Sequence, residues 1–186
     1  MSPSLRLATS DDVPVLNQLI NESVRRLSVG YYTAAQIDSS LRHLFGVDTQ
    51  LILDGTYYVA EADGRVVGCG GWSKRNTLYG GDQSKATEDP LLNPAHEAAR
   101  IRAFFVHPEW ARRGIGRAVI AVCEQAAADA GFLRLELAAT LPGEPLYRAL
   151  GYQGHEQLVA TLPDGQLLPI VRMHKRLPPP HSLSLS

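Results

Sequence analysis

Hydrophobic residues recur along this chain with a helical period in some segments and with strand-like alternation in others. Residues 5–8 form a short strand-like run, and residues 13–24 place apolar side chains on one face of a helix that Thr9 or Ser10 caps. A glycine-containing loop then leads into a second helical pattern, which starts at about Thr33. The N-terminal part of the chain therefore predicts one strand followed by two helices.

A β-hairpin is predicted over residues 57–74, after a break at residues 46–50. Two runs rich in β-branched and aromatic residues flank Asp63-Gly64, and this dipeptide is among the strongest hairpin signals in a sequence. Residues 75–95 follow neither period and are rich in glycine, proline and polar residues. They predict a long loop, which is a candidate lid.

The second half of the chain alternates between strands and helices. The predicted elements are strand 97–108, a helix from about 114 to Gly131, strand 132–140, short helix 143–151, and closing strands 155–162 and 168–177. Pro108 ends the first of these strands because proline cannot continue a central ladder. Strands that alternate with helices and then close in a hairpin predict an α/β fold, in which helices cover both faces of a mixed sheet.

Length and composition favour one domain. The chain has 186 residues, of which 45% are hydrophobic, and this is enough to bury a core yet short for two domains. We predict a single domain over residues 1–177 and a disordered tail over residues 178–186, which have little to bury. The formal net charge of -1 argues against broad attraction to nucleic acid or to an anionic membrane. Any anion site must therefore be local.

Two cysteines, Cys69 and Cys123, stand in apolar runs without a CxxC spacing or a histidine cluster. We therefore expect two buried free thiols and no metal site or disulfide, with a reactive cysteine as the alternative. The N-terminus lacks a basic start followed by an apolar run, and no stretch approaches the roughly 20 apolar residues of a membrane span. We expect a cytoplasmic protein.

The turn "ARRGIG" between a predicted strand and a predicted helix has the features of an anion site. The first N–H groups of a helix have no internal partner, and the helix dipole is positive there. Gly114 and Gly116 lack the Cβ atoms that would keep an oxyanion away from those amides. Arg112, Arg113 and Arg117 add full charges, so the turn suits a pyrophosphate; a tight turn with solvated arginines is the alternative.

Two better-known phosphate loops do not match this turn. The GxxxxGK[ST] pattern fails because Arg117 and Ala118 follow Gly116, and GxGxxG fails because Val119 stands at the third glycine position. A P-loop NTPase and a dinucleotide-binding domain are therefore not supported.

The stretch "FFVHPEWARRGIGRAVIAVCEQAA", followed by "PLYRALGY", resembles the GCN5-related N-acetyltransferase (GNAT) superfamily. In that family a strand, a [QR]xxGx[GA] turn and a helix hold the pyrophosphate of acetyl-coenzyme A. The resemblance implies that backbone amides from Arg112 to Arg117, including Ile115, hold the pyrophosphate. It also implies that the pantetheine arm bonds to the backbone near Phe104, Phe105 and Val106, where this strand splays from the next.

Ala111 departs from the family pattern, because it stands where the family has Gln or Arg three positions before the first glycine. The implied cradle consists mainly of backbone donors, so we expect the site to persist without that side chain.

The same resemblance implies catalytic roles. Tyr147 matches the tyrosine that protonates the coenzyme A thiolate, and packing of the short helix is its alternative role. Glu136 is similar in place to the base of ribosomal-protein acetyltransferases, although the relatives' asparagine falls where this chain has residues 141–143. A base matters because an amine of pKa about 10 is neutral in roughly one molecule per thousand at pH 7. The rival bases are Glu97, His96, His155 and a water chain.

Candidate acceptor-binding residues are Tyr31, Tyr32, Trp72, Arg100 and Arg102. The two arginines would favour an acceptor that carries a carboxylate or phosphate near its amine, and solvated strand charges are the alternative. We therefore predict an N-acetyltransferase that transfers acetyl from acetyl-coenzyme A to a primary amine of a small molecule or peptide. A non-catalytic acyl-coenzyme A sensor is the second hypothesis. Homodimerisation through the closing strands is compatible with this fold, and no motif specifies it.

Overall fold

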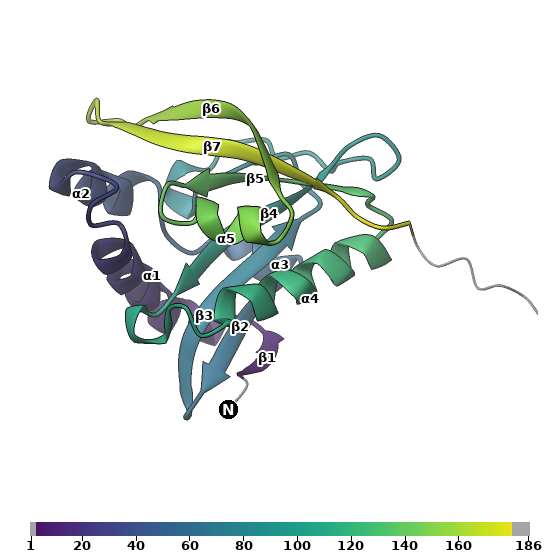
Figure 1. Ribbon diagram of the computed structural model, residues 1–186, viewed down its shortest axis with the longest axis horizontal. Helices are drawn as coiled ribbons and strands as arrows, with labels where there is room; N and C mark the ends of the chain where they lie inside the picture. The colour runs from purple at the N-terminus through teal and green to yellow at the C-terminus, as the bar shows by residue number, and fades with distance from the viewer. Residues whose placement is uncertain (1–2, 180–186) are drawn as a thin grey trace, which may run out of the picture.

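The computed structural model describes residues 3–179, which form one seven-stranded sheet of order β1-β2-β3-β4-β5-β7-β6 (Figure 1). The strands are β1 (Ser4–Leu7), β2 (Tyr57–Ala62), β3 (Arg65–Ser73), β4 (Ala99–Val106), β5 (Arg134–Thr140), β6 (Gln153–Thr161) and β7 (Leu167–Arg176). The helices are α1 (Val13–Leu27), α2 (Ala34–His43), α3 (Thr49–Leu53), α4 (Ile115–Asp129) and α5 (Glu144–Ala149). Only β4 and β5 pair in parallel, so the sheet is mixed, as predicted.

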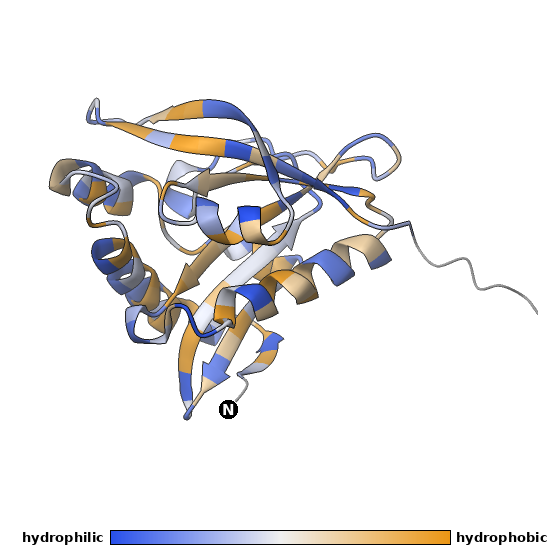
Figure 2. Cartoon of the chain, viewed as in Figure 1, coloured by the Kyte–Doolittle hydropathy of each residue, from blue (hydrophilic) through white to orange (hydrophobic). Residues whose placement is uncertain are grey.

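Helices cover both faces of the sheet. Leu16 and Ile20 of α1 and Ile37 of α2 lie in one buried cluster, whereas Val119 and Ile120 of α4 lie in a second cluster on the opposite face. The apolar side of α4 faces the sheet and its polar side faces outward (Figure 2). The predicted α/β architecture is confirmed, because each helix buries the face that its hydrophobic period defines.

The predicted hairpin is present, whereas one short helix was not predicted. Strands β2 and β3 pair around Asp63 and Gly64, and both residues have positive φ, of 50° and 71°. The break expected at residues 46–50 runs instead into α3, whose first turn is capped by the Asp48 carboxylate. A helix of five residues is too short to show a hydrophobic period, so the sequence pattern could not reveal it.

The central pair of strands separates soon after it forms. Pairing between β4 and β5 is limited to Ala99 with Leu135 and Arg100 with Glu136. Beyond that point β4 bends, with a positive φ of 55° at Ala103 and a register shift against β3, while β5 stays paired with β7 along its length. The backbone groups of β4 that face β5 beyond Arg100 are therefore free of sheet partners.

Arg102 fastens the predicted loop against the sheet. The side chain is 3% exposed, and its guanidinium donates to the Asp48 carboxylate at 2.9 Å. It also donates to the carbonyl oxygens of Thr77, at 2.9 Å, and Gly80, at 2.6 Å. Arg102 is therefore no solvated strand charge, and the loop segment it holds forms a wall beside the sheet.

Cys69 and Cys123 are free and buried, which confirms that prediction. Burial raises the pKa of the Cys69 thiol to about 12. Within residues 3–179 no helix has the length and hydrophobicity of a membrane span, and no three His, Cys, Asp or Glu side chains are grouped to hold a metal ion. The tail expected at residues 178–186 lies outside the described residues from position 180 onward.

An ion pair at the start of α1 makes stability depend on pH. Both terminal nitrogens of Arg6 donate to Asp12 at 2.8 Å, and the backbone of Thr9 donates to the same carboxylate at 2.7 Å. The hydrogen bonds from Arg6 lower the pKa of Asp12 from 3.8 to about 2. Since the folded pKa is depressed, this stabilisation is present above the unfolded pKa and is lost as the pH falls through the folded pKa.

We expect Asp12→Asn to lower the free energy of unfolding at pH 7 by about 1 to 2 kcal/mol. This value is smaller than the pKa shift alone implies, because Arg6 is partly exposed and solvent screens the ion pair. The difference from the wild type should shrink between about pH 4 and pH 2. Urea unfolding at several pH values measures both effects. Asp11→Asn is the matched control, because Asp11 is exposed. A pH-independent deficit in Asp12→Asn would contradict the assignment.

Candidate active site

A cavity of about 550 Å³ occupies the space where β4 and β5 separate, and we call it the β4–β5 cleft. Its walls come from six parts of the chain. They are residues 23–28 of α1 and the loop after it, residues 44–46 of the link after α2, residues 78–81 of the loop, residues 101–106 of β4, residues 111–117 of the turn, and residues 138–149 of β5, α5 and their link. The predicted anion turn and Tyr147 therefore border one cavity.

Gly114 leaves the mouth of this cleft open. It is the N-cap of α4, with a φ of 84° that favours glycine, and no side chain within residues 3–179 caps the helix. A Cβ atom built on Gly114 would meet no other atom within 4 Å. The first amides of α4 therefore have both free donors and free space beside them, which fits a diphosphate.

Gly116 lines the cleft and also lies close to α5. A Cβ atom there would lie 2.8 Å from Cδ2 of Leu146 in α5. A larger residue would displace the Leu146 side chain, so glycine at this position also serves the packing of α5 beside the cleft.

The three arginines of the turn do not act alike. Arg112 and Arg117 are exposed and line the cleft. Arg113 is not part of the cleft wall; its guanidinium lies 5.0 Å above the ring of Trp110. Two side-chain charges therefore accompany the helix dipole at the cleft, and the third stacks on an aromatic ring.

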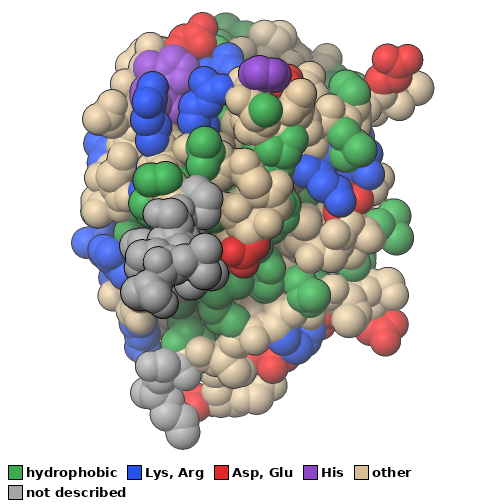
Figure 3. Space-filling model, turned by 90° about the vertical axis from the view of Figure 1, so that its right-hand side faces the viewer, with side chains coloured by type: hydrophobic (Ala, Val, Ile, Leu, Met, Phe, Trp, Pro, Cys, Tyr) green, Lys and Arg blue, Asp and Glu red, His purple; other side chains and the backbone are tan. Residues whose placement is uncertain are grey.

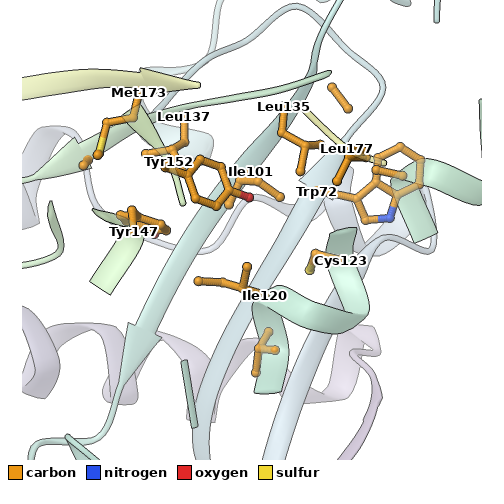
Figure 4. Packing of buried hydrophobic residues seen from close by; sticks show 14 of the residues in the cluster. Trp72, Ile101, Ile120, Cys123, Leu135, Leu137, Tyr147, Tyr152, Met173 and Leu177 are labelled. Atoms are coloured by element: carbon orange, nitrogen blue, oxygen red, sulfur yellow. The ribbon is translucent and has the colours of Figure 1, made fainter. Parts of the chain in front are cut away.

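Tyr147 lies at the inner wall of the cleft among aromatic residues. Its ring makes an edge contact with the ring of Tyr152, with 5.7 Å between the ring centroids (Figure 4). It makes a second edge contact with Phe104, with 6.4 Å between the centroids. Burial raises the pKa of Tyr147, and the neighbouring Cys123 adds to the effect. The hydroxyl therefore stays protonated at neutral pH, as a proton donor must, and the same side chain also packs the core.

A second cavity, of about 570 Å³, lies at the N-terminal ends of β4 and β5 and is called the basic cavity here. It is lined by His96, Glu97, Ala98, Arg100, Arg134, Leu135, Glu136, His155, Arg172, His174, Lys175 and Arg176. Lys, Arg and His side chains gather on this side of the molecule (Figure 3). The cavity brings together all the side chains that the sequence offered as general bases, although they come from separate elements.

Glu136 is held by two arginines in the basic cavity. Arg100 donates to Oε2 at 2.9 Å and Arg172 donates to the same oxygen at 2.8 Å. Burial acts to raise the pKa of Glu136, but the hydrogen bond from Arg172 and the charge of Arg100 outweigh it, so the pKa is lowered. The carboxylate is therefore ionised at neutral pH and is a weak base.

The five predicted acceptor residues do not gather at one place. Tyr31 is exposed, while Tyr32 is buried and its hydroxyl donates to the carbonyl oxygen of Pro169 at 2.6 Å. Trp72 packs in the core under α4 against Phe132. None of the three aromatic residues lines the β4–β5 cleft or the basic cavity.

The two strand arginines face different cavities. Arg102 borders the β4–β5 cleft, and Arg100 borders the basic cavity. Both are buried, and Arg100 donates to the backbone carbonyl of Asn76 at 3.3 Å as well as to Glu136. The alternative of solvated strand charges is therefore wrong for this pair.

Several wall residues of both cavities were missed by sequence reasoning. Ser23, Ser28 and Tyr79 border the β4–β5 cleft, while Arg172 and His174 border the basic cavity. No local pattern distinguishes them, because each reaches its cavity only through the packing of a distant element. The one available signal was the density of basic residues near the end of β7.

Comparisons with known proteins agree with this architecture. The model of the acetyltransferase (GNAT) family matches residues 21–152. A GCN5-related N-acetyltransferase from Rhodopseudomonas palustris superposes with a TM-score of 0.71 at 20% identity, over 95% of this chain and 97% of that chain. No curated protein matches the sequence.

Two further solved structures carry bound coenzyme. The phosphinothricin acetyltransferase of Sinorhizobium meliloti in complex with acetyl-coenzyme A has a TM-score of 0.62 at 19% identity, over 100% of this chain and 97% of that chain. A PaiA N-acetyltransferase from Thermoplasma acidophilum in complex with coenzyme A has a TM-score of 0.62 at 16% identity, over 95% and 100% of the two chains. At these identities the similarity establishes the fold.

Proposed function

The chain belongs to the acetyltransferase (GNAT) family, and we propose that it transfers the acetyl group of acetyl-coenzyme A to a primary amine by direct attack. The observation that carries the proposal is the continuity of the β4–β5 cleft, which runs from the open amides at Gly114 to the Tyr147 side chain. Bound coenzyme in two proteins of the same fold supports this use of the cleft.

The chain offers two sets of backbone donors to acetyl-coenzyme A. Amides of residues 112–117 would hold the diphosphate, with Arg112 and Arg117 adding charge. Backbone groups near Phe104, Phe105 and Val106, which have no partner on β5, would hold the pantetheine arm. When bound, acetyl-coenzyme A supplies a thioester whose carbonyl carbon accepts the amine.

Two side chains carry out the proton transfers. As the nitrogen lone pair forms the new C–N bond, the C–S bond breaks, and Tyr147 donates its proton to the departing sulfur. The nitrogen becomes far more acidic once it is acylated, so Glu136 accepts the proton that it loses, either directly or through water. Solvent then returns a proton to Tyr147 and removes one from Glu136.

The test is release of free thiol from acetyl-coenzyme A in the presence of small primary amines. Because Glu136 stays ionised over the whole neutral range, the neutral fraction of the amine should set the rate. We expect kcat/KM to rise about tenfold per pH unit from pH 6 to 8 for an amine of pKa near 10.

Two other results of this assay would lead to different conclusions. Binding of acetyl-coenzyme A without thiol release for any amine would favour the sensor hypothesis. Absence of binding to the folded protein would overturn the acetyltransferase proposal altogether.

A further inference from the structure

The basic cavity contains two arginines that face each other without a carboxylate between them. Arg134 of β5 and Arg176 of β7 are direct cross-strand partners. Neither forms an ion pair with any carboxylate among residues 3–179. Like charges directly opposite each other in an antiparallel pair are destabilising, so an anion bound at this point would remove a repulsion.

The other lining cations each have a carboxylate partner. Arg100 and Arg172 both bind Glu136, and Lys175 binds Glu124 of α4 at 2.9 Å. The cavity wall has five Lys or Arg residues and two Glu residues, so its balance is positive before any histidine is protonated. Arg172 also keeps a buried Nε without a hydrogen-bond partner among the described residues.

Glu136 provides a negatively charged hydrogen-bond acceptor in the same cavity. Both arginines donate to its Oε2 atom, and no described residue donates to Oε1. Glu136 and Arg134 are two residues apart on one face of β5, so their Cα atoms are about 7 Å apart along the strand. A small molecule with an amine at one end and an anion at the other can span this distance.

The position of Glu136 relates this cavity to the proposed reaction. The Arg100–Glu136 pair is the last contact between β4 and β5 before the strands separate. Glu136 therefore stands at the closed end of the gap between the strands, two residues before Ala138, the first residue of β5 that lines the β4–β5 cleft. An amine held by Glu136 would approach a thioester in the cleft from this end.

We propose that the basic cavity is the acceptor site and that its acceptor is a primary amine bearing a carboxylate or a phosphate. The nitrogen donates a hydrogen bond to Glu136 Oε1, and the anionic group binds between Arg134 and Arg176. This inference rests on the proposed acetyltransferase function for the role of the ligand, whereas anion binding by the cavity does not.

The first experiment compares three small amines as acceptors: ethanolamine, β-alanine and phosphoethanolamine. We expect kcat/KM for one of the two anionic amines to exceed that for ethanolamine by about tenfold or more. The faster of the two identifies carboxylate or phosphate as the preferred group. The preference should disappear in the double variant R134Q/R176Q.

The control is R26Q/R65Q, which removes the same charge from two exposed arginines outside both cavities. It should retain the preference. R134Q/R176Q should melt close to the wild-type temperature, because the substitution removes a cross-strand repulsion as well as the hydrogen bond from Arg134 to the carbonyl oxygen of His96. Loss of preference in both variants, or equal use of all three amines by the wild type, would overturn the acceptor assignment while leaving the acetyltransferase proposal intact.

A second experiment is independent of turnover. Titration of the labelled protein with inorganic phosphate should shift the side-chain NMR signals of Arg134 and Arg176 saturably, apart from any shift at residues 112–117. If no amine is acetylated, these signals still test the anion site: saturable shifts that persist in R26Q/R65Q support it, and unshifted signals in the wild type overturn it.

Discussion

Gly114→Glu is expected to weaken acetyl-coenzyme A binding about 100-fold or more, as measured by calorimetry. The new side chain would enter the open space beside the first amides of α4 and place a carboxylate where the diphosphate is proposed to bind. Two like charges about 4 Å apart repel by roughly 4 kcal/mol near a protein surface, and 100-fold in affinity corresponds to about 2.7 kcal/mol.

Gly165→Glu provides a closely matched control. Gly165 has a φ of 86°, against 84° for Gly114, and a Cβ atom there also meets nothing within 4 Å. Both substitutions therefore impose the same backbone strain, of about 1 to 2 kcal/mol, in open space. Gly165 lies in the turn between β6 and β7, away from the cleft, so its variant should lose stability and keep its affinity. Equal loss of affinity in the two variants would show that strain, rather than the cradle, explains the effect.

Tyr147→Phe is expected to lower kcat about 30-fold at pH 7 while leaving the KM for acetyl-coenzyme A nearly unchanged. A thiol of pKa about 8.5 leaves roughly 2 kcal/mol for an acid to recover at pH 7, and this corresponds to the stated factor. Burial raises the pKa of Tyr147, so the hydroxyl remains a donor across the neutral range. The deficit of the variant should shrink as the pH approaches 9, because the thiolate then departs without protonation.

Tyr152→Phe separates the acid role from packing. The Tyr152 ring contacts Tyr147, and its hydroxyl donates to Glu124 at 2.9 Å on the α4 side of the sheet. Loss of that hydrogen bond should lower the free energy of unfolding by about 1 kcal/mol and change kcat less than twofold. A Tyr147→Phe variant that loses only stability, as Tyr152→Phe should, would contradict the acid assignment.

The sequence by itself determined those features that a few neighbouring residues specify. Asp63-Gly64 determined a hairpin because both residues adopt positive φ, and the pattern around Gly114 determined the strand, turn and helix of the proposed anion site. The helical periods of α1 and α4 determined which faces they bury. These features depend on local conformation and on one face of one element, so a short stretch of sequence encodes them.

The tertiary structure alone decided which of the candidate residues meet. Glu136, His96 and His155 come from different elements, and only the strand order β4-β5-β7-β6 brings them into one cavity. The same order sets Arg134 opposite Arg176. Within residues 3–179 neither arginine has a carboxylate partner. A side chain's neighbours, and with them its pKa and its free hydrogen-bonding atoms, depend on strand pairing over long separations in sequence. Local pattern carries no information on that pairing. For this reason Glu136, His96 and His155 were predicted one by one, whereas Arg134, Arg176 and the assembly of the cavity were not.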